Sequence, residues 1–240
     1  MNDSKTEMLV MKSSRTQIPE IEIRVGSEVH RSSTKVRNLG VMFDSNMSMD
    51  AHVNHICKVS YFQLRKIRHL QSVLCRDALI KLVHAFVTAR LDYCNSVLAG
   101  LSEASLHKLQ LIQNQAARLV SKKACQEHIT PVLKELHWLP VRYHIQFKVL
   151  VLCFKALHGL APSYISDMLS RHEPLRSLRS SDANLLSVPR IRLKSYGERT
   201  FRYTAPSLWN NLPADIRYLS SLEIFKTRIK TVLFKWAYHV

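Results

Sequence analysis

Residues 142–157, RYHIQFKVLVLCFKAL, form the longest strongly apolar segment of the chain. Pro140 stands just before this segment, and Gly159 and Pro162 follow it, as is typical of the two ends of a helix. The apolar side chains fall on most sides of the predicted helix: Ile145, Phe147, Val149, Leu150, Leu152 and Phe154. A helix that is apolar on most sides belongs inside a core. We therefore expect residues 142–157 to be the central element of a helical fold.

Three amphipathic helices are predicted before this segment. The first begins near Ser48 and buries one stripe: Val53, Ile56, Cys57, Ser60, Leu64, Ile67 and Leu74. The second, over about 77–98, is expected to bury Leu79, Leu82, Val83, Phe86, Tyr93 and Val97, with Arg90 on the same stripe. The third starts at Ser102, a good N-cap, and buries Leu106, Leu109, Ala116 and Val120.

The segments around and after the central helix are shorter. Thr130 and Pro131 predict a short helix that reaches Trp138. Residues 171–184 are polar, basic and rich in serine, which is typical of a linker. We expect a short strand over 185–193, an ordered loop over 206–213, and a last helix that opens with a capping box of Ser220 and Glu223. The last helix is expected to bury Phe225, Ile229, Val232, Leu233 and Trp236.

The N-terminal segment has the two-residue period of strands. Apolar Ile21, Ile23 and Val25 alternate with charged residues, and the turn at 26–27 predicts a hairpin. A further strand is expected from Val36 to Phe43. The fold class is therefore mainly α: a helical bundle with a small N-terminal β element and a short C-terminal β/loop segment. The predicted units are 1–47, 48–170 and 171–240.

Charge is the unusual feature of the composition. The 240 residues include 35 Lys and Arg against 18 Asp and Glu, a formal net charge of +17. Residues 1–47 carry a net +1, whereas 48–170 and 171–240 carry +8 each. Such a chain attracts polyanions, and RNA or DNA is the expected partner.

The same composition argues against several locations and cofactors. The N-terminus has no secretory signal, and the apolar run 149–154 is too short to span a bilayer, which needs about 20 residues. The five cysteines are odd in number and never closely paired: Cys57, Cys75, Cys94, Cys125 and Cys153. We therefore expect an intracellular protein, nuclear or cytoplasmic, with no membrane partner and no cofactor.

Two basic surfaces are the candidate nucleic-acid sites. The outer face of the first helix holds Lys58, Phe62, Arg65 and His69, which combine cations for phosphates with a ring for a base. The alternative is an ordinary solvated face. The second surface holds Arg190, Arg192 and Lys194, whose alternation would place all three on one side of a strand.

Smaller clusters favour ordinary structural roles. His52 and His55 are expected at the surface and Cys57 in the buried stripe, so they do not make a metal site. Cys94 lies on an apolar stripe without a nearby base, and a buried thiol is inert. Arg90, if buried, needs an acidic partner such as Asp92. No catalytic or metal residues are predicted.

Several strings resemble the region that follows the catalytic palm in non-LTR (LINE-type) retrotransposon reverse transcriptases. In order, they cover nearly the whole chain: LGVMFDS at 39–45, MDAHV at 49–53, ARLDYCN at 89–95, LQLIQN at 109–114, AARL at 116–119, HITPVL at 128–133, LHWLPVR at 136–142, FKALHGLAP at 154–162 and APSLWNNLP at 205–213.

The resemblance implies a role for each unit. Residues 1–47 would be the edge of the palm and the primer-gripping hairpin, with Lys5 near the leaving pyrophosphate. The helices from 48 onward would be the thumb and the region beyond it. The family is RNA-directed DNA polymerase, but the aspartate pair that holds its two metal ions would lie upstream. We therefore expect no enzymatic activity from this chain.

The function expected from the sequence is binding of RNA or DNA without sequence preference, by a truncated reverse transcriptase remnant. Two alternatives remain. One is a protein-interaction module that uses the exposed surface on which the palm would pack. The other is a polymerase subunit whose catalytic part is encoded upstream.

Overall fold

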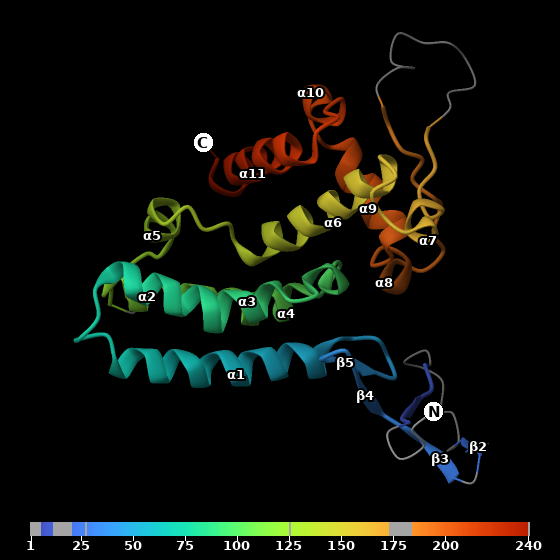
Figure 1. The fold of residues 1–240 in the computed structure, drawn as a ribbon, viewed down its shortest axis with the longest axis horizontal. Helices are drawn as coiled ribbons and strands as arrows, with labels where there is room; N and C mark the ends of the chain where they lie inside the picture. Colours follow the sequence, from blue (N-terminus) through green and yellow to red (C-terminus); the bar gives the residue numbers. More distant parts are fainter. Residues whose placement is uncertain (1–5, 12–20, 27, 125, 173–183, 240) are drawn as a thin grey trace.

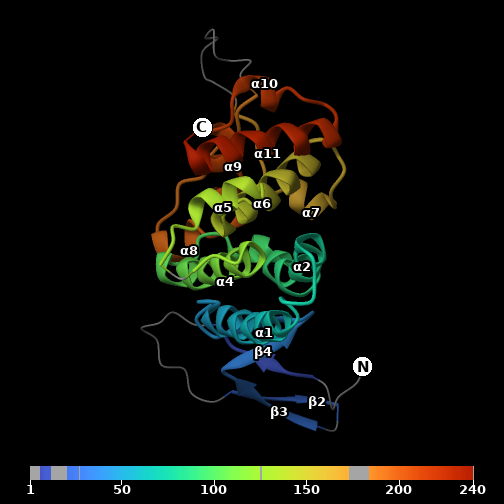
Figure 2. The ribbon, with the colours of Figure 1, turned by 90° about the vertical axis from the view of Figure 1, so that its left-hand side faces the viewer.

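The computed structural model describes residues 6–11, 21–26, 28–124, 126–172 and 184–239. Its elements form a stack of layers (Figures 1 and 2). Two small sheets lie at one end, followed by helix α1, then α2, α3 and α4, then α5 and α6, and last α9, α10 and α11. The predicted class, mainly α with a small β element, is confirmed.

Helix α6, Val141–Leu157, is the central element, as predicted. It packs against α4 on one side and against α9 and α11 on the other. Val149, Leu150, Cys153 and Phe154 are buried, and the ring of Phe154 stacks on Phe225 of α11 with centroids 4.4 Å apart. Burial raises the pKa of the Cys153 thiol far above its ordinary value, so this cysteine is unreactive.

Helices α1, Asp50–His69, and α4, Glu103–Ser121, pack along each other. The predicted stripe of α1 is buried at Val53, Ile56, Ser60, Leu64 and Ile67. The N-cap of α4 is confirmed, because the hydroxyl oxygen of Ser102 accepts a hydrogen bond from the Ser105 amide at 3.2 Å. The Gln113 amide donates to the Leu139 carbonyl at 2.7 Å, which links α4 to the segment that leads into α6.

The predicted helix over 77–98 is not continuous. Helix α2, Arg76–Val83, passes into a π-type turn, His84–Thr88, then α3, Ala89–Asp92, and a 3-10 turn, Asn95–Leu98. A π turn adds one residue, so every later side chain moves to a different face. Val87 and Leu91 are therefore buried instead of Phe86 and Arg90, and Phe86, Tyr93 and Val97 are exposed.

The remaining helices are short except for the last. Their bounds are α5 Thr130–Glu135, α7 Ser163–Ser166, α8 Lys194–Gly197, α9 Phe201–Asn210, α10 Ala214–Arg217 and α11 Leu222–Tyr238. The last helix buries Phe225, Ile229 and Leu233 as predicted, but Trp236 is partly exposed. Residues 173–183, in the predicted linker, lie outside the described residues.

Three predictions for the C-terminal part are wrong in detail. The strand expected over 185–193 is only a single bridge between Arg171 and Leu186. The loop expected over 206–213 is largely helix α9, because burial of Ala205 and Trp209 outweighs the missing amide of Pro206. The capping box does not form, since Ser221 is the N-cap of α11 and the Glu223 carboxylate pairs with Lys226 at 2.7 Å.

The N-terminal sheet has the order β1-β3-β2, with β1 Met8–Leu9, β2 Glu22–Val25 and β3 Glu28–Ser33. The predicted two-residue hairpin is confirmed, with Val25 opposite Glu28 and Gly26 at φ +61°. Ile23 and Val29 are exposed, at 48% and 57%, so this sheet does not bury the apolar residues expected to form its inner face.

The single strand expected over 36–43 is instead a second hairpin. Strands β4, Lys35–Asn38, and β5, Val41–Asp44, are antiparallel, and Leu39 and Gly40 form the turn at φ +47° and +84°. Both turn residues have positive φ, as in a type I′ turn, and Gly40 adopts this conformation without strain. Strand β5 packs against α1.

Asp44 joins this hairpin to α1. Its buried carboxylate accepts hydrogen bonds from the amides of Asn46, Ser48 and Met49 and from the Ser48 hydroxyl, at 2.8–3.2 Å. Met49 itself is left-handed, at φ +64°, and offers no side-chain cap. Asp44 therefore fixes the path of the chain from β5 into the first turn of α1.

Within the described residues, no helix is both long and apolar enough to cross a bilayer. The boundaries predicted at 47 and 170 stay predictions.

We expect the amides of β2 and β3 to exchange with solvent much faster than those of residues 149–154 in α6. Strand β2 is an edge and its side chains are largely exposed, whereas α6 is enclosed by other helices. Hydrogen–deuterium exchange measures the difference directly. Equal protection of the two regions would contradict the prediction.

We expect Asp44→Ala to lower the free energy of unfolding by about 2 kcal/mol or more, because it leaves several amides at the start of α1 without an acceptor. Asp44→Asn is the matched control, since it keeps one carbonyl oxygen and should be less destabilised. Urea denaturation checks both variants. An unchanged midpoint for Asp44→Ala would show that water satisfies these amides equally well.

Candidate nucleic-acid interface

The predicted face of α1 is exposed at all four positions, Lys58, Phe62, Arg65 and His69. They are spaced by four, three and four residues, so they share one side of the helix, opposite the buried stripe. The ammonium of Lys66 lies 4.5 Å from the centroid of the Phe62 ring. Among the described residues, none of these cations is in an ion pair with a carboxylate. The face therefore offers unpaired positive charge beside an exposed ring.

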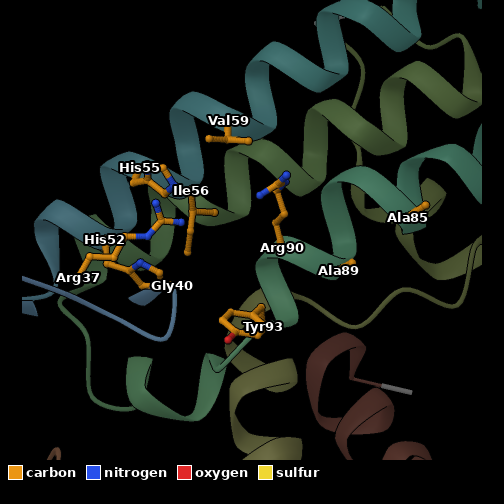
Figure 3. A pocket seen from close by; sticks show the side chains of 10 residues that line it. All are labelled: Arg37, Gly40, His52, His55, Ile56, Val59, Ala85, Ala89, Arg90 and Tyr93. Atoms are coloured by element: carbon orange, nitrogen blue, oxygen red, sulfur yellow. The ribbon is translucent and has the colours of Figure 1, made fainter. Parts of the chain in front are cut away.

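A cleft of about 330 Å³ lies beside this face, between α1, the β4–β5 hairpin and the segment from the π turn to Tyr93 (Figure 3). Its wall on α1 includes His52, His55 and Val59. His55 precedes Lys58 by three residues and Val59 precedes Phe62 by three, so the cleft adjoins the predicted face.

Two arginines line the cleft from different elements. Arg37 comes from β4 and Arg90 from α3, and Figure 3 shows both side chains extending into the space beside α1. The sequence predicted Arg90 on the buried stripe, where it would need an acidic partner such as Asp92, but the π turn brings it to the surface. Within the described part of the chain, no carboxylate lines the cleft and neither arginine forms an ion pair. The cleft is thus electropositive.

His52 is the unusual residue of this cleft. The sequence predicts it at the surface, but it is only 3% exposed because β5 covers it. Its Nδ1 accepts a hydrogen bond from the Met42 amide at 3.4 Å, so the proton of the neutral ring lies on Nε2. Nε2 has no partner among the described atoms. Burial, and then the charge of His55, lower the pKa of His52.

The hairpin is attached to the opposite wall of the cleft. The Tyr93 hydroxyl donates a hydrogen bond to the Leu39 carbonyl at 2.7 Å, which joins the tip of the β4–β5 turn to the end of α3. Gly40 lies against the same ring, since a Cβ there would be 3.5 Å from Tyr93 Cε1. Because this hydrogen bond fixes the hairpin relative to α3, Arg37 and Arg90 both line the same cleft.

Sequence reasoning missed a second basic pocket at the far end of α1 and α4. It encloses about 470 Å³ and is lined by Arg68, Arg118, Lys122 and Lys123. Lys123 pairs with Glu127 at 2.5 Å, and Arg118 donates to the Glu127 carbonyl at 3.1 Å. Arg68 and Arg118 are separated by 50 positions in the sequence, so no local pattern could bring them together.

The C-terminal patch does not form as predicted. Arg190 and Arg192 are exposed in a segment without regular structure, and Lys194 begins helix α8. Because no strand forms there in the described residues, the three do not share a strand face. Figure 1 shows α8 near α9, at the end of the molecule where α1 begins, whereas Arg65 and His69 belong to the last two turns of α1.

The weaker clusters have structural explanations. Within the described residues, no three His, Cys, Asp or Glu side chains are placed to hold a metal ion. Asp92 pairs with His144, with Oδ1 and Nδ1 3.0 Å apart, rather than with Arg90. Cys57 is half-buried and burial raises the pKa of its thiol, so it is not an activated nucleophile.

No family model matches the chain, and no curated protein or solved structure is significantly similar to it. The resemblance to reverse transcriptases therefore stays a prediction from the residues quoted above.

We expect the His52 imidazole to titrate below its ordinary pKa of 6.5. Below pH 6.5 the His52 ring is protonated in the unfolded chain but still largely neutral in the folded chain. The free energy of unfolding should therefore fall as the pH drops below about 6.5. An anion bound in the cleft would favour the charged ring and raise the pKa. NMR titration of the ring with and without inorganic phosphate tests this, with His52→Asn to assign the resonance. A pKa at or above 6.5 in the free protein would contradict the prediction.

Proposed function

We propose that this chain binds the sugar–phosphate backbone of RNA or DNA without sequence preference, as the post-palm part of a non-LTR retrotransposon reverse transcriptase would. The observation that supports the proposal most is the basic cleft beside α1, where Arg37 and Arg90 face a space whose described lining includes no carboxylate. The exposed cations of α1, which form no ion pair within the described residues, add donors beside it.

The chemistry of the cleft suits a phosphate. Guanidinium groups offer paired donors to phosphate oxygens, which a single ammonium does not. The neighbouring Lys58 and Arg65 would neutralise the next phosphates along a strand, and Phe62 would contact a sugar or a base. None of these contacts distinguishes one base from another, so the binding is not sequence-specific.

A protein partner is the second candidate. Ile23, Val29 and Leu39 are exposed on the β element, at 48%, 57% and 82%. By the resemblance, this is the side on which a palm would pack. Association through these residues would be insensitive to salt, whereas binding through the cations weakens steeply as salt rises. A polymerase subunit is a further form of this candidate, in which the partner supplies the metal-binding carboxylates.

We expect Lys58→Ala with Arg65→Ala, and separately Arg37→Ala with Arg90→Ala, to weaken binding to all sequences alike. The slope of log affinity against log salt should become shallower by about 1 for each phosphate that is no longer neutralised. The fold should persist, because exposed charges contribute only about 0–1 kcal/mol each. Filter binding over a salt series measures both quantities.

The matched control is Arg228→Ala with Lys235→Ala, which removes the same charge from the exposed side of α11. This control should keep most of the affinity. If all three pairs reduce binding equally, the effect is one of net charge and the cleft has no special role. If only substitutions at Arg190, Arg192 and Lys194 reduce it, the C-terminal patch is the site instead.

A further inference from the structure

Two adjoining cavities form a groove between α6 and α11, which we call the α6–α11 groove. One encloses about 250 Å³ and includes Phe147, Lys148 and Lys230 in its lining. The other encloses about 640 Å³ and includes Phe147, Lys230 and Phe234. Phe147 and Lys230 line both cavities, so the two lie side by side. This groove involves neither α1 nor the C-terminal patch.

Both walls of the groove carry a half-buried aromatic ring. Phe147 lies on α6 and was expected in the core, but part of it remains open to the groove. Phe234 lies on α11, and its ring makes tilted contacts with Tyr238 and His137, with centroids 4.8 and 5.7 Å apart. A half-buried ring that its neighbours hold in place is suited to stacking against a flat partner.

The groove is also basic. Lys226, Lys230 and Phe234 are four residues apart on α11 and share one face, beside the stripe of Phe225, Ile229 and Leu233 that packs into the core. Lys148 and Lys230 are exposed and form no ion pair within the described part of the chain. The acid in the lining, Asp92, is already engaged by His144 and Asn95.

From this juxtaposition of rings and unpaired cations we propose that the α6–α11 groove binds an unpaired segment of RNA or DNA. Phe147 and Phe234 stack on exposed bases, while Lys148 and Lys230 contact the flanking phosphates. Bases within a duplex are already stacked and paired, so they cannot be taken up by these rings. The inference rests on the proposed function and adds to it a site that selects single strands. An acidic peptide would use the lysines but would have no need of the rings.

The test compares short oligo(U), oligo(dT) and a duplex of the same length by fluorescence anisotropy. Phe147→Leu with Phe234→Leu keeps the apolar volume and removes the stacking faces. We expect this variant to lower the affinity for oligo(U) and oligo(dT) by about tenfold for each stacked base and to leave the affinity for the duplex unchanged. Tyr164→Leu is the aromatic control, because Tyr164 is 63% exposed on α7 and does not line the groove. It should have no effect.

A second variant, Lys148→Gln with Lys230→Gln, tests the groove without altering its apolar packing, with Lys235→Gln as the charge control. The double variant should lower the affinity for single strands and make the salt dependence of that affinity shallower, whereas Lys235→Gln should change neither. This variant decides the question if circular dichroism shows that the phenylalanine variant is unfolded. If the groove variants lose affinity for oligo(U) but keep their affinity for oligo(dT), the groove is still a single-strand site, and its occupant is RNA.

Unchanged single-strand affinity in both groove variants would overturn the inference while leaving the α1 interface intact. Conversely, if neither Lys58→Ala with Arg65→Ala nor Arg37→Ala with Arg90→Ala has an effect but the groove variants fail to bind single strands, the proposed α1 interface is wrong and the groove is the binding site. An oligoglutamate peptide that binds the wild type and the phenylalanine variant, but not Lys148→Gln with Lys230→Gln, would overturn the nucleic-acid assignment in favour of an acidic peptide, provided single-strand binding is unaffected.

Discussion

The burial of α6 on two sides is the constraint on which the rest of the fold depends. Leu150, Cys153 and Phe154 have essentially no exposed surface, and α4 on one side and α9 and α11 on the other are needed to cover them. Each large apolar side chain removed from water in this way contributes roughly 1.5–3 kcal/mol. The layers of helices follow from this requirement. The face of α6 that these helices leave partly open, at Phe147 and Lys148, is one wall of the α6–α11 groove.

A second constraint positions the basic cleft. The Asp44 carboxylate binds the first turn of α1 to the end of β5, and the Tyr93 hydroxyl holds the tip of the same hairpin against α3. The hairpin and α1, which follow each other in the chain, and α3, whose end is joined to the hairpin across 54 positions, therefore enclose one space. Because β5 covers His52, one imidazole nitrogen is buried without a partner among the described atoms, at a place where two arginines also converge.

The π turn at His84–Thr88 connects the fold to the candidate interface. Without the extra residue, Arg90 would continue the stripe of Leu79 and Val83 and would require a buried partner. With it, Val87 and Leu91 fill the core and Arg90 lines the cleft. Such turns occur often at functional sites because they redirect a side chain without ending the helix.

The sequence by itself determined the fold class, the central helix, the stripes of α1 and α4, the N-cap at Ser102 and the first hairpin, since all of these follow from local periodicity and local hydrogen bonding. It also determined that Lys58, Phe62, Arg65 and His69 are exposed. Only the tertiary structure decided that α9 is helical through Pro206, that His52 is buried and that Arg37, Arg90 and the two phenylalanines line their cavities. These features depend on contacts between different elements, from 10 positions apart for Met42 and His52 to 54 for Leu39 and Tyr93. They also depend on the extra residue of the π turn, which an amphipathic pattern does not reveal.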